Sequence, residues 1–139
     1  MEKSWLNIET ATVSCMEKLK VESAWTMLET RGITLKNQKH RFQLVMKNKQ
    51  VWALYENRVV ATGDLAPYIT LSLIDSVPAE YTFIGKTDDY YLGGSGVYPD
   101  VIRPYRRGDI VLPPSGNKCL WVCVEPNETL PVGIHKIGF

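Results

Sequence analysis

The glycine-rich stretch 93–96 (GGSG) is the first place where this sequence could do chemistry, because glycines can expose backbone amides to an anion. A phosphate loop needs a helix and a Lys-Ser/Thr pair directly after its glycines. Here the residues at 97–99 are VYP, and a residue that precedes proline is disfavoured in a helix. The stretch therefore favours a contact loop, with Tyr90, Tyr91 and Tyr98 as flat amphipathic contact residues, although a plain surface loop has the same composition.

Metal-binding and acid–base groups are sparse. His40 and His135 are the only histidines, and no C-x-x-C motif or zinc-type histidine pair accompanies them. Asp88, Asp89 and Asp100 could offer oxygens to calcium but lack the spacing of a calcium loop. We expect solvated carboxylates, no metal and no cofactor.

The three cysteines also argue against catalysis. Cys119 and Cys123 stand in a hydrophobic strand pattern, where an inert buried thiol is the usual outcome. In an extended strand they would lie about 13 Å apart on one face, too far to form a disulfide. With no assembled acid, base and nucleophile, we expect a non-enzymatic protein in a reducing setting.

The net charge is only +1, but it is unevenly distributed. Residues 36–58 are basic and residues 64–100 are acidic, so two copies could pair through opposite charges, although solvated faces would give the same pattern. Arg41, Lys47 and Lys49 could instead face phosphates, a pattern that lysines guarding strand ends would share. Arg106 and Arg107 are two further candidates for contact with a partner.

The elements that would position these residues begin with a helix. Ser14 and Glu17 fit a capping box, and apolar residues at helical spacing follow up to Gly32, which suits a left-handed helix end. Trp5 lies in an N-terminal arm before this helix and is a further contact candidate.

After Gly32 the apolar period changes to two, which indicates strands. We predict one domain with four parts: an arm and helix at 1–34, an antiparallel meander at 40–84, a long loop at 85–104, and a C-terminal hairpin with an edge strand at 105–139. The predicted class is α+β and mostly β, with the helix packed on an antiparallel β-sandwich or open β-barrel.

The segment 105–131 contains an aromatic residue, a Gly-Asp-Ile-Val strand, a Gly/Asn turn and an aromatic-x-Cys strand. It resembles a small β module of bacteriophage tail and fibre proteins, also seen in some carbohydrate-binding modules. The Arg-Gly-Asp at 107–109 inside it is expected to be a turn that enters the strand. The resemblance implies a virion protein without catalytic residues.

We therefore expect a structural protein of a bacteriophage particle (capsid decoration, neck or connector, or tail) that contacts itself and other virion proteins. The alternatives are a carbohydrate-binding adhesion module that uses the tyrosine-rich loop, and a nucleic-acid-binding or host-interfering phage protein that uses the basic segment. No secretion signal or membrane-spanning run of about 18 apolar residues is found, so assembly in the host cytoplasm is expected, with no membrane partner.

Overall fold

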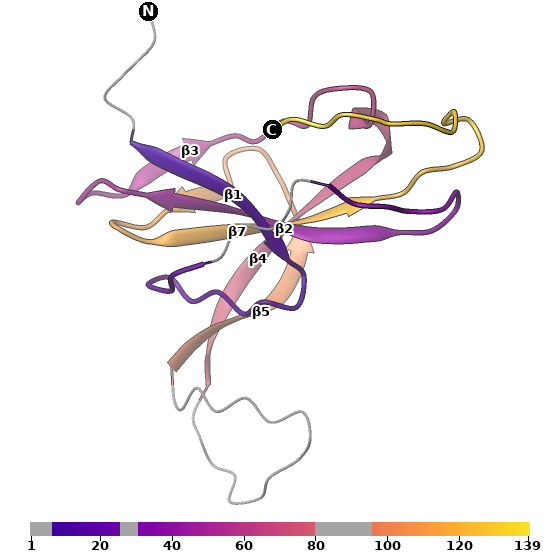
Figure 1. The fold of residues 1–139 in the computed structure, drawn as a ribbon. Helices are drawn as coiled ribbons and strands as arrows, with labels where there is room; N and C mark the ends of the chain where they lie inside the picture. The colour runs from indigo at the N-terminus through magenta and orange to yellow at the C-terminus, as the bar shows by residue number, and fades with distance from the viewer. Residues whose placement is uncertain (1–6, 26–30, 80–95) are drawn as a thin grey trace, which may run out of the picture.

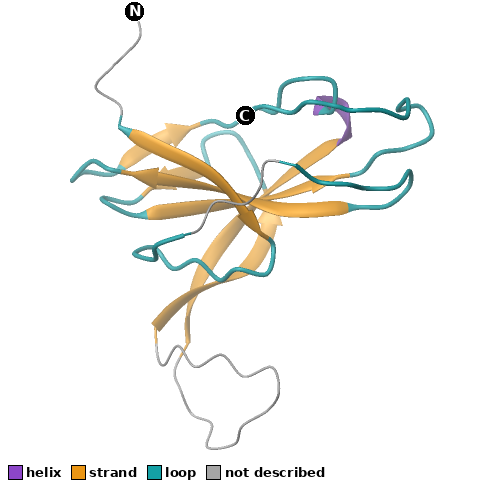
Figure 2. Cartoon of the chain, in the orientation of Figure 1, coloured by secondary structure: helices purple, strands orange, loops and turns teal. Residues whose placement is uncertain are grey.

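The computed structural model describes residues 7–25, 31–79 and 96–139, which form two antiparallel β-sheets (Figures 1 and 2). The larger sheet has the strand order β1-β2-β7-β4-β5, and the smaller sheet pairs β3 with β6. The elements are β1 (Ile8–Ser14), β2 (His40–Asn48), β3 (Leu54–Asn57), the 3₁₀ turn η1 (Ala66–Tyr68), β4 (Ile69–Ala79), β5 (Gly96–Pro104), β6 (Ile110–Leu112) and β7 (Asn117–Val124). In the described part of the chain, no helix is long and apolar enough to cross a membrane.

The main core lies between the two sheets. It is formed by alternate residues of β2, β4 and β7 together with the inward side chains of β6. Side chains point to opposite faces of a strand in turn, so the even-numbered residues of β2 and β7 reach this core. Its buried members are Leu44, Met46, Leu73, Ile110, Leu112, Leu120 and Val122.

The opposite face of the large sheet is covered by the segment 15–25, which has no regular structure. Leu19 from this segment packs with Val13, Val45 and Cys119 in a second buried cluster. The large sheet is therefore buried on both faces, which explains the nearly continuous apolar run CLWVCV at 119–124.

The predicted N-terminal helix is wrong, and the chain is nearly all β rather than α+β. Ser14 ends β1, and its hydroxyl accepts a hydrogen bond from the Met16 amide in a tight turn (3.2 Å). The serine thus satisfies a nearby amide, as a helix cap does, but it ends a strand. The later part of the predicted helix, residues 26–30, lies outside the described residues.

Side-chain amides replace the hydrogen bonds that a helix would make inside the segment 15–25. Gln43 Nε2 donates to the carbonyls of Ser14 and Glu17 (2.8 and 2.7 Å). Asn117 Nδ2 donates to the carbonyls of Lys20 and Ser23 (3.2 and 2.7 Å), and both amide side chains are buried. Because their partners lie far along the chain, local sequence could not reveal them.

The predicted meander is also wrong. β2 pairs with β1 and β7, whereas β3 pairs with β6 in the other sheet. The buried Asn48 lies at the turn after β2, and its side chain donates to the carbonyls of Trp52 and Pro113 (2.8 and 3.1 Å), which directs the chain towards the small sheet. Within the range of the predicted meander, residues 59–61 have no regular structure, and residues 80–84 lie outside the described residues.

The predicted C-terminal hairpin is not a hairpin. β6 and β7 lie in different sheets, so the Pro-Pro-Ser-Gly turn at 113–116 carries the chain from one sheet to the other. The predicted edge strand at 132–139 is reduced to a single bridge between Thr62 and Gly138. The prediction of a long loop at 85–104 is wrong for residues 96–104, which form β5.

β4 and β5 extend past the rest of the large sheet as a two-stranded arm (Figure 1). β7 pairs with β4 only from Ile69 to Leu73, whereas β5 pairs with β4 from Ser72 to Ala79. Residues 80–95 connect the far ends of these two strands.

Candidate functional site

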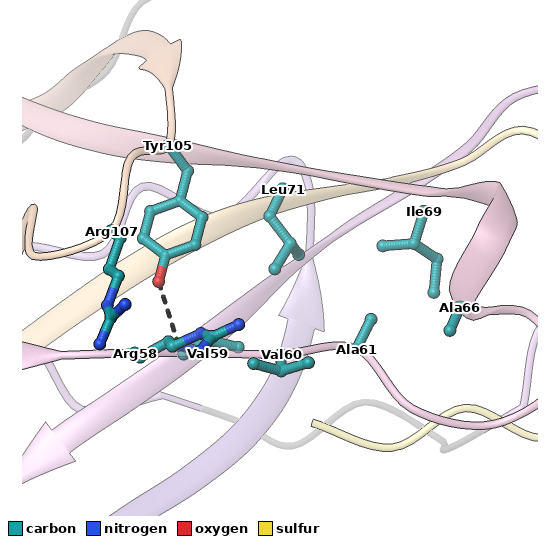
Figure 3. Close-up of a pocket in the computed structure, with 9 residues that line it drawn as sticks. All are labelled: Arg58, Val59, Val60, Ala61, Ala66, Ile69, Leu71, Tyr105 and Arg107. Atoms are coloured by element: carbon teal, nitrogen blue, oxygen red, sulfur yellow. Dashed lines mark hydrogen bonds between the residues drawn. The ribbon is translucent and has the colours of Figure 1, made fainter.

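A groove of about 410 Å³ opens between the segment 58–61 and the start of β4 (Figure 3). Its walls are apolar along most of their length, and a phenol and two guanidinium groups gather where the segment begins. The apolar lining residues are Val59, Val60, Ala61, Ala66, Ile69 and Leu71, and the polar ones are Arg58, Tyr105 and Arg107.

Tyr105 holds this groove in shape. Its ring packs against the main core, and its hydroxyl accepts a hydrogen bond from the Val59 amide at 3.2 Å. Figure 3 shows the phenol reaching from the end of β5 to the segment 58–61. This contact joins two parts of the chain that are 46 residues apart.

The arginines near the groove differ in their partners. Arg103 forms ion pairs with Asp75 and Asp109, the second at 2.8 Å, and the hydrogen bond from Arg103 lowers the pKa of Asp109. For Arg58 and Arg107, in contrast, no carboxylate of the described residues lies within ion-pair distance, and both side chains are exposed. Within the described residues, the groove therefore presents two positive charges that have no carboxylate partner.

The segment 58–61 also has free backbone groups. The amide of Val59 bonds to Tyr105, whereas the amides and carbonyls of Val60 and Ala61 have no hydrogen-bond partner among the described residues. Exposed backbone donors and acceptors beside a groove can pair with an added polypeptide chain.

Tyr98, predicted to be an exposed contact residue, is buried in β5 with 8% of its surface accessible. The Lys20 ammonium lies 4.3 Å from the centre of its ring, so the aromatic face is occupied by a cation of the segment 15–25. Trp5, Tyr90 and Tyr91 lie outside the described residues.

The basic residues predicted to contact phosphates are brought together only in part, because Lys47 and Lys49 both lie beside Glu9 whereas Arg41 does not. Arg41 and Lys47 stand at opposite ends of β2, about 20 Å apart in an extended strand. Lys49 forms an exposed ion pair with Glu9 at 2.6 Å, so a phosphate would have to compete with this carboxylate. Of the two further arginine candidates, Arg107 lines the groove and Arg106 does not.

The Arg-Gly-Asp sequence forms a turn, as expected. Gly108 has a φ of +87°, a conformation that suits glycine, and the Asp109 amide donates to the Arg106 carbonyl (3.1 Å). The Asp109 carboxylate accepts a hydrogen bond from the Arg106 amide and is paired with Arg103, so its charge serves the turn.

The described residues hold no group of three potential metal ligands. His135 contacts Asp64 (2.7 Å) and the Pro131 carbonyl (2.8 Å), which links the C-terminal segment to the loop before η1. Burial raises the pKa of the Cys119 thiol to about 12, which leaves it an unreactive core residue. The contacts of His135 and the burial of Cys119 stabilise the fold, and His135 and Cys119 do not form a nucleophile–base pair.

Large apolar side chains are exposed on the outer side of the small sheet and on the edge strand β5. Tyr55 and Val111 lie in β3 and β6 and are 71% and 41% exposed, while Trp52 precedes them in the turn after β2. On β5, Val97, Val101 and Ile102 are each about half exposed. Tyr55 and Val111 lie on paired strands, and exposed apolar side chains that are close together are typical of surfaces that contact other proteins.

Sequence reasoning found Arg107 but missed Arg58, Tyr105 and the apolar walls of the groove. The aromatic residue and arginines at 105–107 were a usable signal, but their approach to the segment 58–61 depends on the pairing of β3 with β6. No family model matches this chain, and no curated protein is significantly similar to it. What can be said of its function therefore follows from these surfaces.

Proposed function

We propose that this protein is a non-enzymatic structural component of a bacteriophage particle, acting through contacts with copies of itself and with neighbouring virion proteins. The observation that carries the proposal is the combination of a cationic, apolar groove with exposed apolar side chains on the small sheet and on the β5 edge. Such a surface can make several protein contacts at once.

Two further points support the proposal. The segment 105–131, which resembles a phage tail and fibre module, contributes β6 and β7, one strand of each sheet. Burial raises the pKa values of the Cys119 and Cys123 thiols, and a thiol that stays protonated is a weak nucleophile.

The two alternatives are less well supported by the described residues. The ring face of Tyr98 is covered by Lys20, which removes one of the three tyrosines proposed to stack on a sugar. Arg41 lies at the opposite end of β2 from Lys47, and Lys49 is paired with Glu9, so these three cations do not form one basic patch.

The proposal can be tested by mass spectrometry of purified phage particles. The particles are taken from cells that express this gene from its phage genome and are purified by density gradient. We expect the chain in the particles at a fixed ratio to the other virion proteins, retained after a high-salt wash. A chain that is abundant in the lysate but missing from the washed particles would contradict the proposal. A non-structural protein of the same phage, followed in the same fractions, is the control for carry-over.

A further inference from the structure

We propose that the groove binds residues 86–92 of a second copy of this chain, with the carboxylates of Asp88 and Asp89 held by Arg58 and Arg107. The inference deepens the proposed function, because it assigns one of the self-contacts that such a component would need. The groove lies within the described residues, and the segment that would bind in it follows β4 in the sequence.

Charge complementarity is the first argument. The groove carries two guanidinium groups without carboxylate partners among the described residues, and residues 88–89 are two adjacent carboxylates. Guanidinium groups bind carboxylates through paired hydrogen bonds, which makes arginine well suited to such a contact. Arg103, in the same stretch of chain, already has Asp75 and Asp109 and needs no further anion.

The order of residues is the second argument. Asp88 and Asp89 are followed directly by Tyr90, Tyr91 and Leu92. The groove likewise has guanidinium groups at the start of the segment 58–61 and apolar walls beyond them, made by Val60, Ala61, Ala66 and Ile69 (Figure 3). A peptide in which two acidic residues come first and larger, less polar residues follow therefore matches the order of charged and apolar surfaces along the groove.

The free backbone groups of Val60 and Ala61 favour a polypeptide as the occupant. A peptide laid along the segment 58–61 can satisfy these amides and carbonyls with its own backbone, as an added strand does at a sheet edge. A small carboxylate or a fatty acid would leave them without such partners.

Geometry favours a second copy over the same chain. Asp88 stands eight residues before Gly96, so the intervening chain can span at most about 29 Å. β5 alone, from Gly96 to Pro104, is about 26 Å long, and the groove lies beyond its end. The segment of a second copy has no such limit, and the contact is then head to tail, with a different surface used on each copy.

Sedimentation velocity of the full chain, from about 1 µM to about 1 mM, is the first measurement. We expect concentration-dependent association that is weakened at least about tenfold in the Arg58→Ala, Arg107→Ala double variant. Arg106→Ala is the matched control, because Arg106 is an exposed arginine next to Arg107 that does not line the groove. Circular dichroism and the thermal midpoint establish that each variant is folded.

Mixing two variants tests the head-to-tail arrangement. The groove double variant keeps an intact segment 86–92, and an Asp88→Asn, Asp89→Asn variant keeps an intact groove. Each alone should remain monomeric, whereas their mixture should stop at a 1:1 dimer, because one productive contact is left. If the groove variant does not fold, the Asp88→Asn, Asp89→Asn variant and a fluorescein-labelled KTDDYYL peptide on the wild-type chain carry the test, with KTNNYYL as the control peptide.

A wild-type chain that stays monomeric over the whole range would overturn the inference. So would a groove variant that associates as the wild type does, or equal binding of the two peptides. Any of these results with the chain still present in purified particles would refute this contact and leave the proposed function standing. Association through the groove by a chain that is absent from the particles would support this contact and refute the proposed function.

Discussion

One face of the five-stranded sheet is covered by a second sheet, and the other is covered by the irregular segment 15–25. The first cover is held by apolar side chains of β6, whose backbone is paired with β3. The second cover has no backbone ladder of its own and depends on the side-chain amides of Gln43 and Asn117. Regular and irregular covers of one sheet are thus stabilised by different interactions.

The largest effect is expected where the regular cover loses core volume. Ile110→Ala should lower the free energy of unfolding by about 2–5 kcal/mol, because Ile110 is fully buried and the change leaves a cavity. Urea denaturation measures this loss. The control Val111→Ala, on the exposed side of the same strand, should change stability by no more than about 0.5 kcal/mol. Equal losses for the two variants would show that the small sheet does not form the core described.

An intermediate effect is expected where the irregular cover loses its hydrogen bonds. Asn117→Ala removes the donor to the Lys20 and Ser23 carbonyls and the acceptor of the Trp25 indole N–H (3.2 Å). We expect a loss of about 1–3 kcal/mol, because buried polar groups are left unsatisfied. Denaturation and tryptophan fluorescence measure the change, with the exposed amide variant Gln38→Ala as the control. An unchanged stability would mean that the Asn117 side chain does not hold the segment 15–25 in place.

The smallest effect concerns the C-terminal segment, a second irregular part held by side-chain bonds. Both ring nitrogens of His135 face acceptors, the Pro131 carbonyl and the Asp64 carboxylate, which raises the pKa of His135. The protonated ring can donate to both acceptors, so its stabilisation is complete below its ordinary pKa of about 6.5 and is lost as pH rises through the raised value. Hydrogen exchange at the paired amides of Thr62 and Gly138 measures this segment.

We expect the protection of these two amides, corrected for intrinsic exchange, to fall between about pH 5.5 and about pH 8.5. His135→Gln should abolish this pH dependence while His40 is retained. Persistence of the same dependence in the variant would assign it to another group. The pKa of Asp64 is lowered by the hydrogen bond from His135, so the contribution of Asp64 is lost only as pH falls through a value below its ordinary one.

The strand content could be predicted where alternation or a continuous apolar run was clear. β2 and β7 lie where the sequence placed strands, and the burial of Cys119 and Cys123 follows from the apolar run of β7. The helix prediction failed because the spacing of Ser14, Val21 and Trp25 fits a helix, although their hydrogen-bond partners lie in other strands. Gln43 of β2 bonds to the Ser14 carbonyl, and Asn117 of β7 bonds to Val21 and Trp25. The candidate site was predicted only through Arg107.

By itself, the sequence determined the turn at 106–109, the buried strands β2 and β7 and the separation of basic from acidic residues, because these depend on side chains close together in the chain. The tertiary structure alone decided that β3 pairs with β6, that the segment 15–25 covers a sheet without forming a helix, and that Arg58 meets Tyr105 and Arg107 at one groove. Strand pairing and buried amide contacts join residues tens of positions apart, and local periodicity carries no record of the partner.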